Sequence, residues 1–257
     1  MSAQFKSVLA SFSKPRHFLQ NIYAVADARM PHHLVYMRNH KAACTSVILS
    51  LMKHRATLEG ENVDDLNIRE VHGRPAGIFV DVKALGGPAS HDLVQSPESF
   101  TFSFVRHPLE RAASAFADKV AGSPRHRAKI MRTIGKSGAD DITFPEFIHA
   151  LTTNPAALDL DRHWRPQHKE LASGLISYDF LGALPNMDRD LPAILTFGFG
   201  AGQNAVADAR DAFGHKTRSK DLIDELSSTE KSAFEEVMAQ DYALYEDALG
   251  AAFTDGP

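Results

Sequence analysis

The chain has 257 residues, of which 44% are hydrophobic and 23% charged, a composition typical of a single-domain globular protein with a sizeable core. Its formal net charge of −4 at pH 7 excludes a global positive field that would draw it onto nucleic acid or an anionic membrane, so any anion site is local. The single cysteine, Cys44, excludes an intrachain disulfide, and the sequence shows neither a secretion signal nor about 18 consecutive apolar residues, so we expect a cytoplasmic protein without integral membrane association.

The first part of the chain predicts a strand, a loop and a helix in succession. Residues 1–30 predict a helical N-terminal arm that Pro15 interrupts. The apolar stretch HLVYM at 33–37 predicts a buried strand, and CTSVILSLMKHR at 44–55 predicts a helix. The loop between them, RNHKAA, carries Lys41.

The middle of the chain repeats this unit. A polar stretch from 59 to about 96 comes first, in which VHGRPAGIFVDV at 71–82 predicts a short strand. SFTFSFV at 99–105 predicts another strand, and PLERAASAFADKV at 108–120 predicts a helix because proline suits the first helical position.

The last part of the chain contains further helices and one more strand. FPEFIHAL at 144–151 starts a helix, GLISYDFLG at 174–182 predicts a strand, and residues 227–249 predict an amphipathic C-terminal helix. Strands that alternate with helices predict an α/β fold with a mainly parallel central sheet flanked by helices, which binds ligands at the carboxyl ends of its strands.

A basic stretch from 123 to 138 contains five cations and no acid. Its cations are Arg125, Arg127, Lys129, Arg132 and Lys136. They form either a solvated helix face or a contact for an anionic acceptor.

The loop before the first of these helices has the features of an anion site. A helix N-terminus offers unpaired N–H groups and a positive dipole end, which favour phosphate or sulfate. Lys41 lies just before the helix, and the small Ala42 and Ala43 let the backbone approach an oxyanion closely. Thr45 and Ser46 supply hydroxyl donors. The loop lacks the glycines of a nucleotide-triphosphate P-loop, which argues against an ATP or GTP site. The alternative to an anion site is a buried helix whose preceding lysine faces the solvent.

The second unit has a similar set of donors. Arg106 stands at the end of the strand, Ser114 lies about two turns into the helix, and Arg111 is one turn nearer its start. A guanidinium and a hydroxyl that converge on one crevice suit a dianionic phosphate. The alternative is an arginine paired with an acid such as Glu110.

HKAACTS and VRHPLERAASAF together resemble two motifs of sulfotransferases that use 3′-phosphoadenosine 5′-phosphosulfate (PAPS), namely the 5′-phosphosulfate loop and the 3′-phosphate motif. The similar group contains the Golgi carbohydrate sulfotransferases and their bacterial relatives. FPEFIHAL, RHWRPQHKEL and ISYDFLGALPNMDRDL resemble later blocks of this group in the same order. The resemblance covers residues 33–250, and the chain departs from the group's pattern at His40, Ala43, His107 and Pro185.

This resemblance implies a P-loop-like sulfotransferase fold, no metal, and an acceptor hydroxyl on a carbohydrate or glycolipid. The residues implied around the 5′-phosphosulfate are Lys41, Ala42, Ala43, Cys44, Thr45 and Ser46. Those implied around the 3′-phosphate are Arg106 and Ser114.

The reaction needs two further groups. Lys41 is the candidate that stabilises the leaving phosphate, and a histidine is best matched to remove the acceptor proton at neutral pH. His72 is the first choice, because it matches loosely the position where uronyl 2-O-sulfotransferases of this group carry their base. His40 is the second choice, and we interpret His163 as a structural residue that donates to the backbone.

Trp164, Arg165 and Gln167 are candidates for contact with the acceptor or the cofactor, and Trp164 fits core packing equally well. Lys216 and Arg218 either close over the nucleotide or belong to a solvated turn.

Two other functions stay open. One is a P-loop-type nucleotide-dependent kinase, against which the missing glycines argue. The other is a non-catalytic protein that binds PAPS or its product, since the same binding residues would serve it. The sequence sets neither the acceptor nor the oligomeric state.

Overall fold

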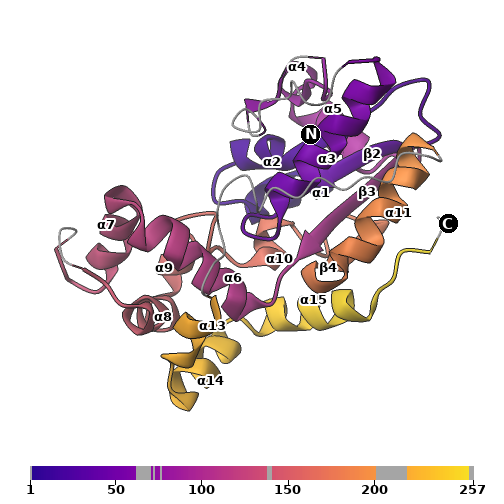
Figure 1. Ribbon diagram of the computed structural model, residues 1–257. Coiled ribbons are helices and arrows are strands. Elements are labelled where there is room, and N and C mark those ends of the chain that lie inside the picture. Colours follow the sequence, from indigo (N-terminus) through magenta and orange to yellow (C-terminus); the bar gives the residue numbers. More distant parts are fainter. Residues whose placement is uncertain are drawn as a thin grey trace.

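In the computed structural model, four strands form one sheet in the order β1-β2-β3-β4 (Figure 1). The structure describes residues 2–61, 71, 73–75, 77–137, 141–200 and 219–254. β1 (Ile22–Val25) is antiparallel to β2 (His33–Met37). β3 (Ser99–Val105) runs parallel to β2 on one side and to β4 (Phe180–Ala183) on the other. The carboxyl ends of β2, β3 and β4 therefore meet at one edge of the sheet.

Helices cover both faces of this sheet, as the alternating side chains of its buried strands require. Leu34 and Tyr36 join one core, and Val35 joins the other. The helices of the first face are α3 (Cys44–Leu58) and α11 (Met187–Phe199). Those of the second face are α1 (Ala3–Ser11), α2 (Arg16–Asn21), α4 (Val82–Leu85), α5 (Gly87–Val94) and α15 (Ala239–Gly250). This arrangement confirms the predicted α/β class with a mainly parallel sheet.

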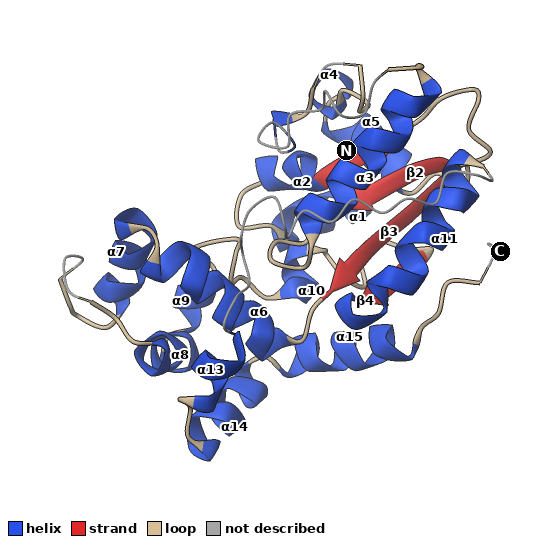
Figure 2. Cartoon of the chain, in the orientation of Figure 1, coloured by secondary structure: helices blue, strands red, loops and turns tan. Residues whose placement is uncertain are grey.

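A helical lobe lies beside the sheet (Figure 2). Its core is rich in aromatic side chains, including Phe116, Phe147 and Trp164. Its elements are α6 (Pro108–Ala115), the π-helix η3 (Phe116–Ala121), α7 (Pro124–Thr133), α8 (Phe144–Thr153), α9 (Pro155–Leu158), α13 (Ser219–Asp224) and α14 (Ser228–Val237). Two short helices, α10 (Gln167–Glu170) and the 3₁₀ turn η4 (Leu184–Asn186), stand before and after β4.

Three predicted segments differ from the structure near the sheet. IYAV at 22–25 forms β1 instead of extending the helical arm, because it pairs with β2 along its whole length. The described residues of 71–82 form no strand, and α4 begins at Val82. Val80 N nevertheless donates to Ala24 O of β1 at 2.9 Å. The strand predicted at 174–182 begins only at Phe180.

Two predicted helices are each divided. The segment 108–120 starts as α6 and continues as the π-helix η3. The C-terminal segment breaks at Met238 into α14 and α15. Met238 packs in the core of the helical lobe while Tyr245 packs against the sheet, so the break lets one segment serve both cores. Among the described residues, no helix has the length and apolar character needed to cross a membrane.

Candidate active site

The loop between β2 and α3 has an unusual backbone. Lys41 and Ala43 both have positive φ, of 65° and 55°, in the left-handed region that residues with a side chain rarely adopt. Such conformations gather at ligand-binding sites, where surrounding contacts hold them in place. Ala43 occupies the N-cap position of α3 and has no side chain that can cap the helix. Ala43 therefore gives the start of α3 no side-chain cap, and a helix N-terminus is the kind of position that binds an anion.

Gln167 joins the two candidate binding loops. Its Oε1 accepts hydrogen bonds from Asn39 Nδ2 at 2.8 Å and from Arg106 N at 3.0 Å. Its Nε2 donates to Arg106 O at 2.8 Å, and Asn39 also donates to Phe104 O at 3.0 Å. Gln167 is fully buried, so these bonds are shielded from water. The loops that follow β2 and β3 are thus fixed to each other by one amide.

Arg111 has a structural position and does not reach toward an open crevice. Its side chain is buried, and Nε donates to His40 O at 2.7 Å. Its two terminal nitrogens donate to Arg165 O at 2.8 Å and Arg162 O at 3.1 Å. Burial lowers the pKa of Arg111 to about 10, which leaves it charged at neutral pH. All three nitrogens of this guanidinium therefore hold backbone carbonyls, which corrects its placement beside Ser114 as a donor to phosphate.

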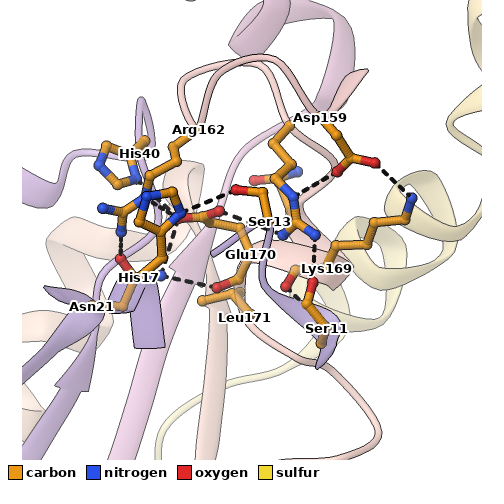
Figure 3. A network of polar contacts seen from close by, with 12 residues as sticks. Ser11, Ser13, His17, Asn21, His40, Asp159, Arg162, Lys169, Glu170 and Leu171 are labelled. Atoms are coloured by element: carbon orange, nitrogen blue, oxygen red, sulfur yellow. Dashed lines mark hydrogen bonds and ion pairs between the residues drawn. The ribbon is translucent and has the colours of Figure 1, made fainter. Parts of the chain in front are cut away.

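A buried carboxylate, Glu170, supports the loop from behind (Figure 3). Its Oε1 accepts from Arg162 Nε at 2.8 Å and Asn21 Nδ2 at 3.0 Å, and lies 3.4 Å from His40 Nδ1. Burial raises the pKa of Glu170, but the nearby His40 ring and the charge of Arg162 outweigh it and hold that pKa well below its usual range. Burial lowers the pKa of His40 well below its usual range. His40 is therefore a neutral, supporting residue.

Lys41 forms an ion pair across the site. Its Nζ lies 2.9 Å from Asp118 Oδ2, and the same oxygen is 3.1 Å from Lys119 Nζ. Asp118 and Lys119 both belong to η3, and π-helices occur often at functional sites. Burial raises the pKa of Asp118, but Lys41 and Lys119 together lower it to about 2. An anion that binds this loop would compete with Asp118 for Lys41.

Arg106 and Ser114 both lie on the second unit. Arg106 Nε is 3.3 Å from Glu110 Oε2, so the ion pair that the sequence offered as an alternative is present. The Glu110 side chain is 49% exposed, and an exposed pair of this kind adds little stability. Ser114 is buried in α6. Their role toward a 3′-phosphate stays a prediction.

The remaining candidates have mixed outcomes. Cys44 and Thr45 are partly buried, and Ala42 and Ser46 are buried, at the start of α3. His72, Lys216 and Arg218 lie outside the described residues. Trp164 packs in the core and donates to Ala157 O at 2.9 Å.

The interpretation of His163 was wrong about its hydrogen-bond partner. The His163 ring contacts a carboxylate, with Nδ1 2.6 Å from Asp161 Oδ1, where the sequence suggested a bond to the backbone. In the basic stretch, three of the five cations pair with acids, and Arg125, Arg132 and Lys136 are exposed, which fits the solvated helix face. The three ion pairs are Arg127 with Asp141, Lys129 with Asp161, and Lys136 with Glu146. A contact with an anionic acceptor stays a prediction.

Sequence reasoning missed two structural residues of the site, Glu170 and Asn39, and it named Gln167 only as a candidate ligand contact, not as the residue that joins the two loops. Gln167 and Glu170 lie in the block RPQHKEL, where their burial is not visible in the sequence. Their hydrogen-bond partners are far away along the chain: Asn39 and Gln167 differ by 128 in residue number, and Asn21 and Glu170 by 149. The only signal in the sequence was that Gln167 and Glu170 are polar residues within a block that resembles the sulfotransferase group.

Comparisons with known proteins agree with this geometry. A model described as "Sulfotransferase family" matches residues 27–246. Carbohydrate sulfotransferase 14 of Homo sapiens is 29% identical over 158 residues, which cover 57% of this chain and 42% of that protein. Carbohydrate sulfotransferase 8 of Mus musculus is 26% identical over 235 residues, which cover 83% of this chain and 54% of that protein. The chain thus spans about half the length of these curated relatives, or less. No solved structure gave a significant match.

Proposed function

Because the chain belongs to the sulfotransferase family, as the match over residues 27–246 shows, we propose that it transfers a sulfuryl group from PAPS to a hydroxyl group of a carbohydrate. The observation that carries this proposal is the pair of loops after the parallel strands β2 and β3. Gln167 fixes these loops to each other, and each presents a cation, Lys41 or Arg106, at the carboxyl edge of the sheet. Ligands of α/β proteins bind at this edge.

The residues at the two loops fit an anionic nucleotide. Lys41 and Arg106 each pair with an acid that is partly exposed, so a phosphate can replace that partner at small cost. Arg38 Nε, at the start of the first loop, is buried without a hydrogen-bond partner among the described residues. We assign the 5′-phosphosulfate to Lys41 and the start of α3, and the 3′-phosphate to Arg106 and Ser114.

Each group has a distinct part in the reaction. PAPS supplies an activated sulfuryl group. Lys41 stabilises the negative charge that develops on the leaving phosphate, a contribution whose loss typically costs about 10²–10³ in rate. Arg111 holds the carbonyl of His40, next to Lys41, and so positions the loop. A histidine takes the proton of the acceptor hydroxyl, and His72 is the candidate from the sequence.

A carbohydrate acceptor is supported by the two relatives, both of which are named carbohydrate sulfotransferases. The kinase alternative is weakened by the loop, which lacks glycine and uses left-handed Lys41 and Ala43 instead. A non-catalytic PAPS-binding protein would use the same cations, and only turnover distinguishes it from an enzyme. A cytoplasmic location stays a prediction from the single cysteine.

Isothermal titration of the full chain tests the donor. We expect 3′-phosphoadenosine 5′-phosphate to bind at least tenfold more tightly than 5′-AMP or ATP, and Arg106→Ala to remove this preference. Arg16→Ala is the matched control, because Arg16 is exposed on α2. Preference for ATP would favour the kinase instead. Transfer of labelled sulfate from PAPS to a glycoside then separates an enzyme from a binding protein.

A further inference from the structure

His163 forms a tightly organised pair with Asp161. His163 Nδ1 is 2.6 Å from Asp161 Oδ1, and the backbone N of His163 also donates to this oxygen at 3.2 Å. The other oxygen, Oδ2, is 2.5 Å from Lys129 Nζ and 3.4 Å from His126 Nε2. Asp161 is therefore held on both sides, which places a proton on His163 Nδ1 and leaves Nε2 as an acceptor.

This pair lies beside the phosphosulfate loop. The His163 ring is 5.1 Å from the ring of His40, the residue before Lys41, in an edge-on arrangement. The backbone carbonyls of Arg162 and Arg165, on either side of His163, are bound by Arg111, which also binds His40 O. One buried side chain thus fixes the distance between the loop and the segment that carries His163.

His163 remains accessible and neutral at this position. Its side chain is 24% exposed, whereas that of His40 is 10% exposed with Nδ1 directed toward Glu170. Burial lowers the pKa of His163, and this effect exceeds the opposite effect of Asp161. The titratable groups around the pair are Asp161 of its own segment, His126 and Lys129 of α7, Lys119 of η3, and His40 and Lys41 of the loop.

The same atoms do not favour a metal ion. Single ligand atoms of His126, Asp161 and His163 lie within 4.8 Å of one another, a spacing that a metal ion can bridge. However, the ammonium group of Lys129 already occupies Asp161 Oδ2, and the positive charges of Lys119 and Lys41 act on His163. A divalent ion would have to displace one cation and lie near two more. The cluster is better suited to proton transfer.

We propose that His163, oriented by Asp161, is the general base for the acceptor hydroxyl, an assignment that rests on the proposed sulfotransferase function. The hydroxyl gives its proton to His163 Nε2, and the oxygen lone pair forms a new O–S bond. The bond from sulfur to the bridging oxygen breaks, and its electron pair goes to the 5′-phosphate of the leaving nucleotide. Asp161 stabilises the imidazolium ion, which returns its proton to solvent.

The test measures transfer and donor binding separately with the full chain. The donor is PAPS, and the acceptors are a panel of p-nitrophenyl galactoside, N-acetylgalactosaminide and glucuronide. His163→Asn retains an N–H that can donate to Asp161, so we expect unchanged affinity for 3′-phosphoadenosine 5′-phosphate but a fall in kcat of about 10²–10⁴-fold. The acidic limb of the pH profile should also disappear.

Asp161→Asn gives an independent readout. It removes the negative charge that raises the pKa of His163 while keeping an oxygen that can accept from Nδ1, so the acidic limb should move to lower pH while kcat falls. His168→Asn is the matched control, because His168 Nδ1 is 2.7 Å from Asp241 Oδ1 and its side chain is also 24% exposed, on α10. This control should keep the wild-type pH profile.

Three results would decide against the assignment. If His163→Asn transfers sulfate at the wild-type rate with an unchanged acidic limb, the assignment of His163 as the base is wrong, while the sulfotransferase function stands. The same holds if His72→Asn loses the acidic limb and His163→Asn keeps it. If the wild type transfers sulfate to no glycoside although it binds 3′-phosphoadenosine 5′-phosphate, the enzymatic function fails and the base assignment fails with it.

Discussion

Arg111 Nε donates to His40 O at 2.7 Å, so the helix of the second binding unit holds the loop of the first. The two motifs, which are separate in the sequence, are therefore connected directly by a hydrogen bond in the structure. Gln167 makes a second connection between them, from Asn39 to the backbone of Arg106. The geometry of the candidate site thus depends on buried residues that need not touch a ligand.

Replacement of Arg111 should destabilise the whole chain. Arg111→Met keeps most of the volume but leaves three carbonyls, those of His40, Arg162 and Arg165, without their donor. We expect the free energy of unfolding to fall by about 3 kcal/mol, measured by urea denaturation. Arg111→Lys should recover only part of this loss, because one amine cannot span three carbonyls. An exposed control, Arg16→Met, should unfold like the wild type.

Replacement of Gln167 should weaken donor binding more than it weakens the fold. Gln167→Met is similar in size but cannot bridge Asn39 and Arg106. We expect the affinity for 3′-phosphoadenosine 5′-phosphate to fall about tenfold by titration, which equals about 1.4 kcal/mol. Gln240→Met, at an exposed position of α15, serves as the control. Unchanged affinity in Gln167→Met would show that the loops keep their spacing without this amide.

Removal of the Asp118 charge should have opposite effects on stability and binding. Asp118→Asn no longer competes for Lys41, so affinity for 3′-phosphoadenosine 5′-phosphate should rise about threefold to tenfold at pH 7. Stability should fall, since the folded pKa of Asp118 is lowered from 3.8 to about 2. A lowered carboxyl pKa stabilises the fold above about pH 4 and loses this effect as the pH falls through about 2. The difference in the free energy of unfolding between wild type and Asp118→Asn should therefore shrink as the pH falls across this range. Asp92 is exposed on α5, so Asp92→Asn should have the same free energy of unfolding as the wild type at each pH.

Lys119 should tune the pH profile through His163. The positive charge of Lys119 contributes to the lowered pKa of His163, so Lys119→Gln should raise that pKa. Because a general base must be neutral, the acidic limb of kcat/KM should move to higher pH and activity at pH 6 should fall. Lys83→Gln, at an exposed position of α4, should leave the limb in place. Movement of the limb to lower pH in Lys119→Gln would contradict the electrostatic explanation.

The sequence predicts correctly those strands and helix starts that have a clear local pattern. HLVYM and SFTFSFV are apolar runs without competing patterns, and both form strands where predicted. Pro108 starts α6 as expected, and Cys44 starts α3. In these places the chain's local preference and its tertiary environment favour the same structure.

The remaining features depend on contacts between distant segments. IYAV is only four residues long and becomes β1 because the edge of β2 is available to it. The interpretation of His163 failed because Asp161 lies two residues away, where a side-chain contact depends on the local turn and leaves no periodic signal. The role of Arg111 was hidden because an arginine beside an anion motif has the same composition whether it binds phosphate or three carbonyls.

Glu170 contacts three parts of the molecule: Asn21 at the end of α2, His40 in the loop between β2 and α3, and Arg162 in the segment before α10. None of these segments can leave without exposing a buried, ionised carboxylate or depriving it of a partner. The three segments should therefore open as one cooperative unit, and amide hydrogens in them should exchange at a common rate set by that opening. We therefore expect the loop that carries Lys41, despite the positive φ of Lys41 and Ala43, to exchange as slowly as the core.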